Sequence, residues 1–154
     1  MAEAIHETAK AKKTAYVSFS KNTAVLTTSD GVHAKIMVAP TAVVTTAPDW
    51  TDIFLLARRY DRKKAGKQEF QGLWIHPSQP HRLLTFTIER QGADEIQPSG
   101  RKMILDRFQI TLRSGGYIVW ADSAGRVYKL MPPKKPAAAV VLEGFEESTR
   151  GLGQ

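Results

Sequence analysis

Apolar and polar residues alternate along most of this chain, with the period of two that is typical of β-strands. The first half contains four short runs rich in Val, Thr and aromatic residues, at residues 14–20, 23–29, 32–40 and 41–48. Turn-forming residues such as Asn22, Gly31 and Pro40 separate these runs. The pattern predicts four strands before residue 50.

The second half of the chain continues the alternation. Its candidate strands lie within residues 69–76, 81–90, 101–116 and 117–130, and the last of these segments contains a hairpin turn at residues 122–125. In an alternating strand Met103 and Leu105 would fall on one face and Phe108 on the other, so these apolar residues would not all point inward. A β-bulge near Asp106 would reconcile the two phases, so we expect one there.

Between these halves the period changes to that of a helix. The apolar positions Trp50, Ile53, Phe54, Ala57 and Tyr60 recur at helical spacing and predict an amphipathic helix over about residues 50–65. Asp49 precedes the first helical residue and suits the N-cap position. Gly66 suits the end of the helix.

These elements predict an α+β fold that is predominantly antiparallel β. We expect about nine strands, arranged as a sheet or barrel-like, with one central amphipathic helix. Residues 1–13 are predicted to form a flexible N-terminal arm, residues 14–131 a single β-rich domain, and residues 132–154 an extended C-terminal tail.

Positive charge is concentrated in one short segment at the end of the predicted helix. The chain carries a net charge of +7, and residues 58–67 hold six basic residues against the single acid Asp61. The six are Arg58, Arg59, Arg62, Lys63, Lys64 and Lys67. A local excess of this kind suits an anionic partner better than a diffuse one does. The alternative is a solvated helix face whose basic residues only suit the helix dipole.

Aromatic residues supply the second feature of a candidate nucleic-acid site. Proteins bind single strands with aromatic stacking platforms beside a basic groove. Trp74 and Trp120 lie on predicted strands, and Arg126 flanks the last hairpin, so these three residues join the six basic residues as candidate binding residues. The alternative for both tryptophans is a place in the core.

Several chemistries are absent from the sequence. The chain has no cysteine, which excludes thiolate metal sites and cysteine nucleophiles. His76 and His81 lack a convincing third metal ligand, so we expect no metal and no cofactor. None of the usual hydrolase, phosphate-loop or zinc-protease motifs occurs, so we expect no catalytic residues and no enzyme. Asp106 is expected to form a structural ion pair with Arg101 or Arg107.

The charge pattern favours a nucleic-acid-binding protein with weak sequence specificity and a preference for single strands. The alternative is a structural or adaptor subunit of a larger assembly that uses its terminal arms, either as a homo-oligomer or with other proteins. No apolar run is long enough to span a membrane or to act as a secretory signal, so we expect a cytoplasmic location and no membrane partner.

Overall fold

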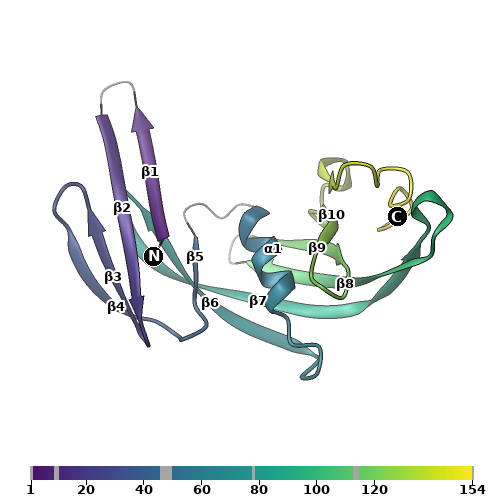
Figure 1. Cartoon of the computed structure of the whole chain (residues 1–154), viewed down its shortest axis with the longest axis horizontal. Helices are drawn as coiled ribbons and strands as arrows, with labels where there is room; N and C mark the ends of the chain where they lie inside the picture. Colours follow the sequence, from purple (N-terminus) through teal and green to yellow (C-terminus); the bar gives the residue numbers. More distant parts are fainter. Residues whose placement is uncertain (1, 9–10, 46–49, 78, 113–114, 154) are drawn as a thin grey trace. The chain divides into compact units, whose positions relative to one another are not determined.

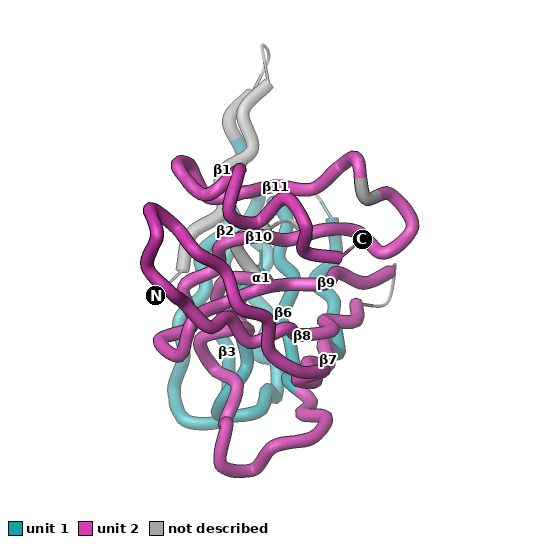
Figure 2. Tube along the Cα trace, turned by 90° about the vertical axis from the view of Figure 1, so that its right-hand side faces the viewer, with its two compact units in different colours: residues 1–49, 70–85 teal, residues 50–69, 86–154 magenta. Residues whose placement is uncertain are grey.

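The computed structural model covers the whole chain and describes residues 2–8, 11–45, 50–77, 79–112 and 115–153. These residues form two compact units (Figure 2). Unit 1 comprises residues 1–49 and 70–85, and unit 2 comprises residues 50–69 and 86–154. Asp49, the predicted N-cap, lies outside the described residues. The prediction of a single domain over residues 14–131 stays a prediction.

One sheet is antiparallel and has the strand order β1-β2-β3-β4 (Figure 1). Its strands are β1 (Ala2–Thr8), β2 (Ala11–Ser20), β3 (Thr23–Thr28) and β4 (His33–Met37). The flexible arm predicted for residues 1–13 is therefore largely strand in the structure. In the register of this hairpin Ala4 of β1 stands opposite Ala15 of β2.

The other sheet is mixed and has the order β11-β10-β9-β8-β7-β6-β5, with β5 parallel to β6. Three of its strands precede residue 100, namely β5 (Val43–Thr45), β6 (Lys67–His76) and β7 (Gln79–Ile96). The other four are β8 (Met103–Leu112), β9 (Gly115–Ala121), β10 (Val127–Met131) and β11 (Val140–Val141). Two short 3₁₀ helices, Pro98–Gly100 and Pro136–Ala138, lie in the connections.

The predicted fold class is confirmed. The protein is mostly β, its pairings are predominantly antiparallel, and the described residues contain one α-helix, α1 (Trp50–Arg59). Of the two expected arrangements, the structure shows open sheets rather than a barrel, because each described sheet has two end strands. No helix in the described part of the chain has the length and apolar content that crossing a membrane requires.

Unit 1 buries the inward positions of its alternating strands. Ala15 and Val17 of β2, Leu26 of β3 and Ile36 of β4 form one core with residues of β6, notably Leu73 and Ile75. This arrangement follows from the period-two pattern, since alternate side chains of a strand point to the same face.

Unit 2 buries both faces of strand β8. Leu105 packs with Ile96, Trp120 and Tyr128 on one face. Phe108 lies on the opposite face, where its ring meets that of Tyr60 edge to face, with the two ring centroids 5.0 Å apart. The phase change in this strand therefore reflects two separate cores. The predicted bulge near Asp106 is absent from β8, whose register with β9 is unbroken. The register shift lies instead in β7, between Arg90 and Gly92.

The C-terminal residues cover one face of unit 2 instead of forming an extended tail. Leu142, Phe145 and Leu152 pack against the core around Trp120. The ammonium group of the buried Lys129 donates hydrogen bonds to the carbonyls of Thr149 at 2.9 Å and Leu152 at 2.8 Å. The proline-rich start of the segment suggested an extended chain, but its apolar residues find a partner on the second face of the sheet.

Candidate nucleic-acid interface

The basic segment does not continue the helix. Helix α1 ends at Arg59 rather than near residue 65. A carboxylate oxygen of Asp61 accepts hydrogen bonds from the backbone N–H groups of Lys63 at 3.0 Å and Lys64 at 3.4 Å, which closes a local turn. Positive φ angles at Ala65 and Gly66 then reverse the chain into β6.

This early end changes the arrangement of the six predicted cations. Arg58 and Arg59 remain on α1, the next three lie in the turn, and Lys67 begins β6. Arg58 and Arg62 therefore do not share a helix face, although their spacing of four predicted that they would.

Arg62 turns inward and forms an internal ion pair. Its Nε donates to Asp106 at 2.8 Å, and its Nη2 donates to the carbonyl of Asp122 at 2.7 Å. Arg90 donates through Nε to the other oxygen of the same carboxylate at 2.7 Å. Asp106 is thus a structural pair partner, as expected, but of Arg62 and Arg90 instead of Arg101 or Arg107. Arg107 pairs with Asp94.

The environment of Asp106 holds it in its charged form. Burial alone would raise the pKa of this carboxyl group, whose side chain is only 14% exposed. The hydrogen bonds and charges of Arg90 and Arg62 outweigh the burial and lower the pKa below its ordinary value. Asp106 therefore holds two guanidinium groups in place at neutral pH.

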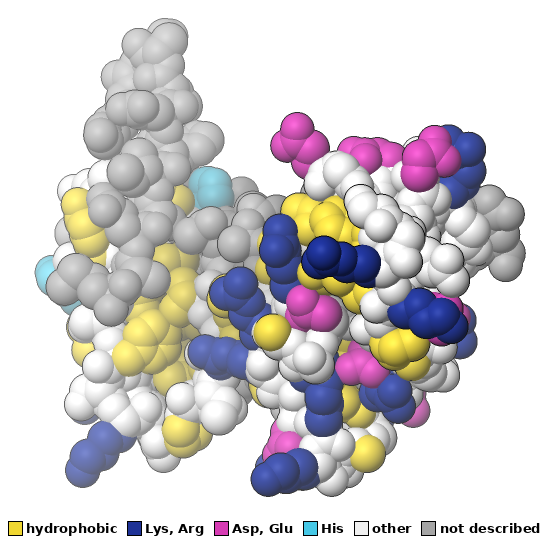
Figure 3. Space-filling view, turned by 45° about the vertical axis from the view of Figure 1, so that its right-hand side comes forward, with side chains coloured by type: hydrophobic (Ala, Val, Ile, Leu, Met, Phe, Trp, Pro, Cys, Tyr) yellow, Lys and Arg dark blue, Asp and Glu magenta, His cyan; other side chains and the backbone are white. Residues whose placement is uncertain are grey.

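The other basic residues of the segment remain at the surface. Arg58, Arg59, Lys63, Lys64 and Lys67 are exposed. The ion pairs found among described residues include none with Arg58 or with the three lysines. Figure 3 shows dark-blue Lys and Arg side chains interspersed with magenta Asp and Glu side chains instead of gathered in one continuous area.

The turn between β9 and β10 brings Arg126 to the end of α1. A β-carbon at Gly125 would lie 2.6 Å from the Cα of Arg58, so only glycine permits this close approach. Arg58 and the neighbouring Arg126 consequently line one groove of about 360 Å³, which we call the α1 groove. Its other lining residues are Phe54, Leu55, Gly125, Val127 and Leu142.

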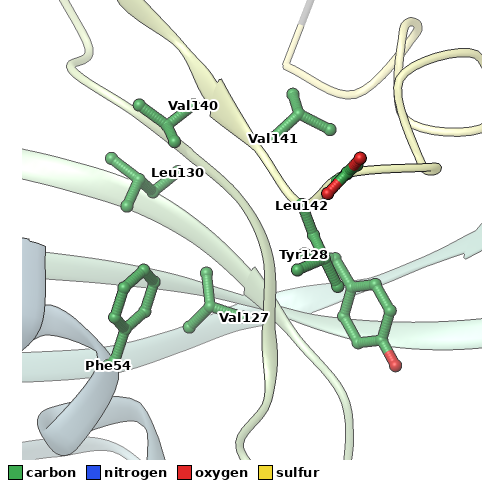
Figure 4. Close-up of a pocket in the computed structure, with 8 residues that line it drawn as sticks. Phe54, Val127, Tyr128, Leu130, Val140, Val141 and Leu142 are labelled. Atoms are coloured by element: carbon green, nitrogen blue, oxygen red, sulfur yellow. The ribbon is translucent and has the colours of Figure 1, made fainter.

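The α1 groove has an apolar floor that continues into an adjoining cavity of about 230 Å³. Figure 4 shows Phe54 of α1 and Val127 of β10 lying opposite one another, with Val140, Val141 and Leu142 beyond them. Phe54 is 38% exposed, and Leu55 beside it is exposed to a similar degree. Glu143 lines the adjoining cavity and makes that end unfavourable for an anion.

The two predicted stacking tryptophans have different places. Trp120 is fully buried, and its indole N–H donates to Asp94 at 2.8 Å. Trp120 is therefore a core residue, because a base cannot reach its ring. Trp74 belongs to unit 1, where it is half-buried, stacks on His76 and lies 5.5 Å beneath the guanidinium of Arg82. Arg126 is exposed and lies 5.6 Å over the ring of Tyr128.

The sequence interpretation missed the aromatic residue that the structure places beside the arginines. Phe54 was assigned to the buried stripe, but Ile53, Leu56 and Ala57 occupy that face of α1. A signal was present, since five consecutive apolar residues from Ile53 to Ala57 cannot all face one sheet.

Among the described residues, no three His, Asp or Glu side chains gather closely enough to hold a metal ion. The arrangement in unit 2 is instead a groove lined by apolar residues, one accessible aromatic ring and two arginines. No protein-family model, curated protein sequence or solved structure matches this chain.

Proposed function

We propose that this protein binds nucleic acid along the α1 groove without catalysing a reaction, and that single strands are its preferred ligand. One observation carries the proposal: Arg58 and Arg126, far apart in the sequence, line the same groove as the exposed ring of Phe54. Basic groups beside an accessible aromatic ring are the usual combination in single-strand binding.

Each part of the groove has a role in this proposal. The guanidinium groups of Arg58 and Arg126 bind phosphate oxygens, for which their planar forks are well suited. One base stacks on Phe54, and stacking of this kind accepts every base. Lys63 and Lys64 in the turn after α1, and Lys67 at the start of β6, add a long-range attraction for the strand that salt weakens. Weak sequence specificity follows, because hydrogen bonds to base edges are not part of this binding mode.

The proposal is tested by fluorescence anisotropy with a labelled single strand of mixed sequence. With about four phosphate contacts, the logarithm of affinity should fall with the logarithm of salt concentration at a slope of about −3. The double variant Arg58→Gln/Arg126→Gln should bind more weakly, and its slope should be shallower by about 1.4.

The matched control is Lys134→Gln/Lys135→Gln, which removes the same charge from an exposed turn elsewhere in unit 2. The control should keep most of the affinity of the parent. Equal losses in the two double variants would show that only net charge matters. Binding by Arg58→Gln/Arg126→Gln as tight as that of the parent would refute the α1 groove as the interface.

A second candidate function, an adaptor subunit in a larger assembly, is favoured by the apolar floor of the same groove. Exposed apolar surface of this kind is a common feature of protein interfaces. An assembly held by Phe54 and Leu55 would give discrete oligomers or complexes in size-exclusion chromatography that persist at high salt. Nucleic-acid binding by the α1 groove would instead be lost at high salt, so one salt series separates the two functions.

A further inference from the structure

A separate cavity in unit 2 is partly lined by the turn that follows α1. It has a volume of about 240 Å³ and is lined by Tyr60, Arg62, Ala65, Gly66, Arg90 and Asp106. Unlike the α1 groove, it is lined by charged and polar groups. The two arginines come from distant parts of the chain, one from the turn after α1 and the other from β7.

The charges of this cavity do not balance. Two guanidinium groups share the single carboxylate of Asp106, which leaves an excess of one positive charge. Both carboxylate oxygens are already engaged, Oδ2 with Arg62 and Oδ1 with Arg90. In the described hydrogen bonds Arg90 donates only through Nε, so its two terminal amino groups remain available to a ligand.

The two arginines are also held in position before any ligand arrives. Arg62 is fixed by Asp106, by the carbonyl of Asp122 and by the ring of Phe108, 5.8 Å from its guanidinium carbon. The side chains of Arg62 and Arg90 are 31% and 44% exposed, so solvent screens them only in part. Binding to such pre-organised groups costs less side-chain entropy than binding to freely moving ones.

We propose that the cavity lined by Arg62 and Arg90 is a binding site for one phosphate group, which we call the seat. Two guanidinium groups around one cavity suit the several oxygens of a tetrahedral phosphate. The excess positive charge attracts the anion. Asp106 orients the arginines, while Arg62 keeps Nη1 and Arg90 keeps both terminal nitrogens for the ligand. The ligand is either inorganic phosphate or a phosphate group of a nucleic-acid strand.

The first test uses inorganic phosphate, with chloride added to keep the ionic strength constant. In the parent protein the side-chain N–H signals of Arg62 and Arg90 should shift saturably in nuclear magnetic resonance spectra as phosphate is added. The variant Arg90→Gln should bind phosphate at least about tenfold more weakly, the scale of one lost charge-assisted hydrogen bond. Arg101→Gln, an exposed site of the same charge, should bind like the parent.

The outcomes separate the seat from the α1 groove. Shifts that do not saturate, or equal losses in Arg90→Gln and Arg101→Gln, would overturn the proposal. Because phosphate alone is the probe, the seat can be confirmed even where Arg58→Gln/Arg126→Gln shows that the α1 groove binds no strand. Circular dichroism spectra check that Arg90→Gln remains folded, and the shifts in the parent protein test the proposal without any variant.

The source of the phosphate is distinguished by adding an unlabelled single strand to the phosphate-saturated protein. Displacement of inorganic phosphate from Arg62 and Arg90 would assign the seat to the backbone of a strand. Persistence of the phosphate-induced shifts, with the strand bound elsewhere or not at all, would assign the seat to free phosphate or a small phosphate ester. Both results support the seat, and they differ only in the ligand that fills it.

Discussion

The two faces of the sheet in unit 2 are covered in different ways. On one face Phe108 of β8 meets Tyr60, which directly follows α1, and on the other Trp120 lies beneath the C-terminal residues. Beside α1, Phe54 and Arg58 remain exposed along a groove. On the C-terminal side, Lys129 donates hydrogen bonds to the carbonyls of Thr149 and Leu152 and so holds the covering residues in place. The comparison shows that one sheet can carry both a sealed core and an accessible surface.

The basic residues of the two faces differ in what they contact. Lys129, on the C-terminal side, donates to two carbonyls of the same chain and serves the structure. Arg62, over the ring of Phe108, pairs with Asp106 and also lines the cavity proposed to bind phosphate. Arg58 reaches no carboxylate among the ion pairs of described residues and faces the α1 groove. Whether a cation is structural or available to a ligand therefore depends on which acceptors the fold places near it, and its position in the sequence does not reveal this.

The largest effect is expected on the sealed face. Trp120→Ala should lower the free energy of unfolding by about 3–5 kcal/mol, since it removes the largest fully buried side chain among the described residues and leaves a cavity. Urea unfolding measures this loss. A Trp120 that served as a stacking platform would behave differently, with nucleic-acid affinity lost and stability kept.

A smaller effect is expected where the arginine pair meets Asp106. Asp106→Asn should cost about 1–3 kcal/mol at pH 7, because both guanidinium groups lose a charged acceptor. The pKa of Asp106 is lowered in the folded protein, so its contribution is present above the unfolded value of about 3.9. The contribution is lost as the pH falls through the folded pKa.

Unfolding curves of the parent and Asp106→Asn at several pH values check this prediction. The difference between their free energies of unfolding should shrink as the pH is lowered from 7 to 3 and below. A difference that stays constant over this range would mean that the charge of Asp106 does not stabilise the fold.

The cover on the C-terminal side should loosen without Lys129. Lys129→Met keeps the length of the side chain but removes the donor to the carbonyls of Thr149 and Leu152, at a cost of about 1–2 kcal/mol. Amide hydrogen exchange at Thr149 should accelerate by roughly 5- to 30-fold when exchange occurs through local opening. Lys134→Met, on an exposed residue, should leave that exchange rate unchanged.

The smallest effect on stability is expected beside the α1 groove. Phe54→Ala should change the free energy of unfolding by less than about 1 kcal/mol, because its ring is partly exposed. Its neighbour Ile53 is fully buried, and Ile53→Ala should cost about 2–5 kcal/mol. Chemical unfolding of this pair of variants tests the two faces of one helix. Equal losses would show that Phe54 belongs to the core and cannot act as a stacking ring.

The predictable part of the fold is the part that local pattern controls. Alternation in β2, β3, β7 and β8 predicted strands, and helical spacing predicted α1, because side-chain direction repeats with the period of each element. The end of α1 was less predictable, because the turn after it depends on the side chain of Asp61, which accepts a hydrogen bond from the backbone N–H of Lys63. The conflict between Leu105 and Phe108 was visible, but its cause required knowing that residues near the C-terminus cover a second face.

The sequence alone determined a β-rich fold with one central helix and a concentration of positive charge after it, because these properties depend on residue type and short-range spacing. The tertiary structure decided which of those charges are available. It turned Arg62 towards Asp106, buried Trp120, and brought Arg126 beside Arg58 across a turn that only Gly125 permits. The physical reason is that hydrogen-bond acceptors and apolar surfaces distant in the sequence come together only when the chain folds.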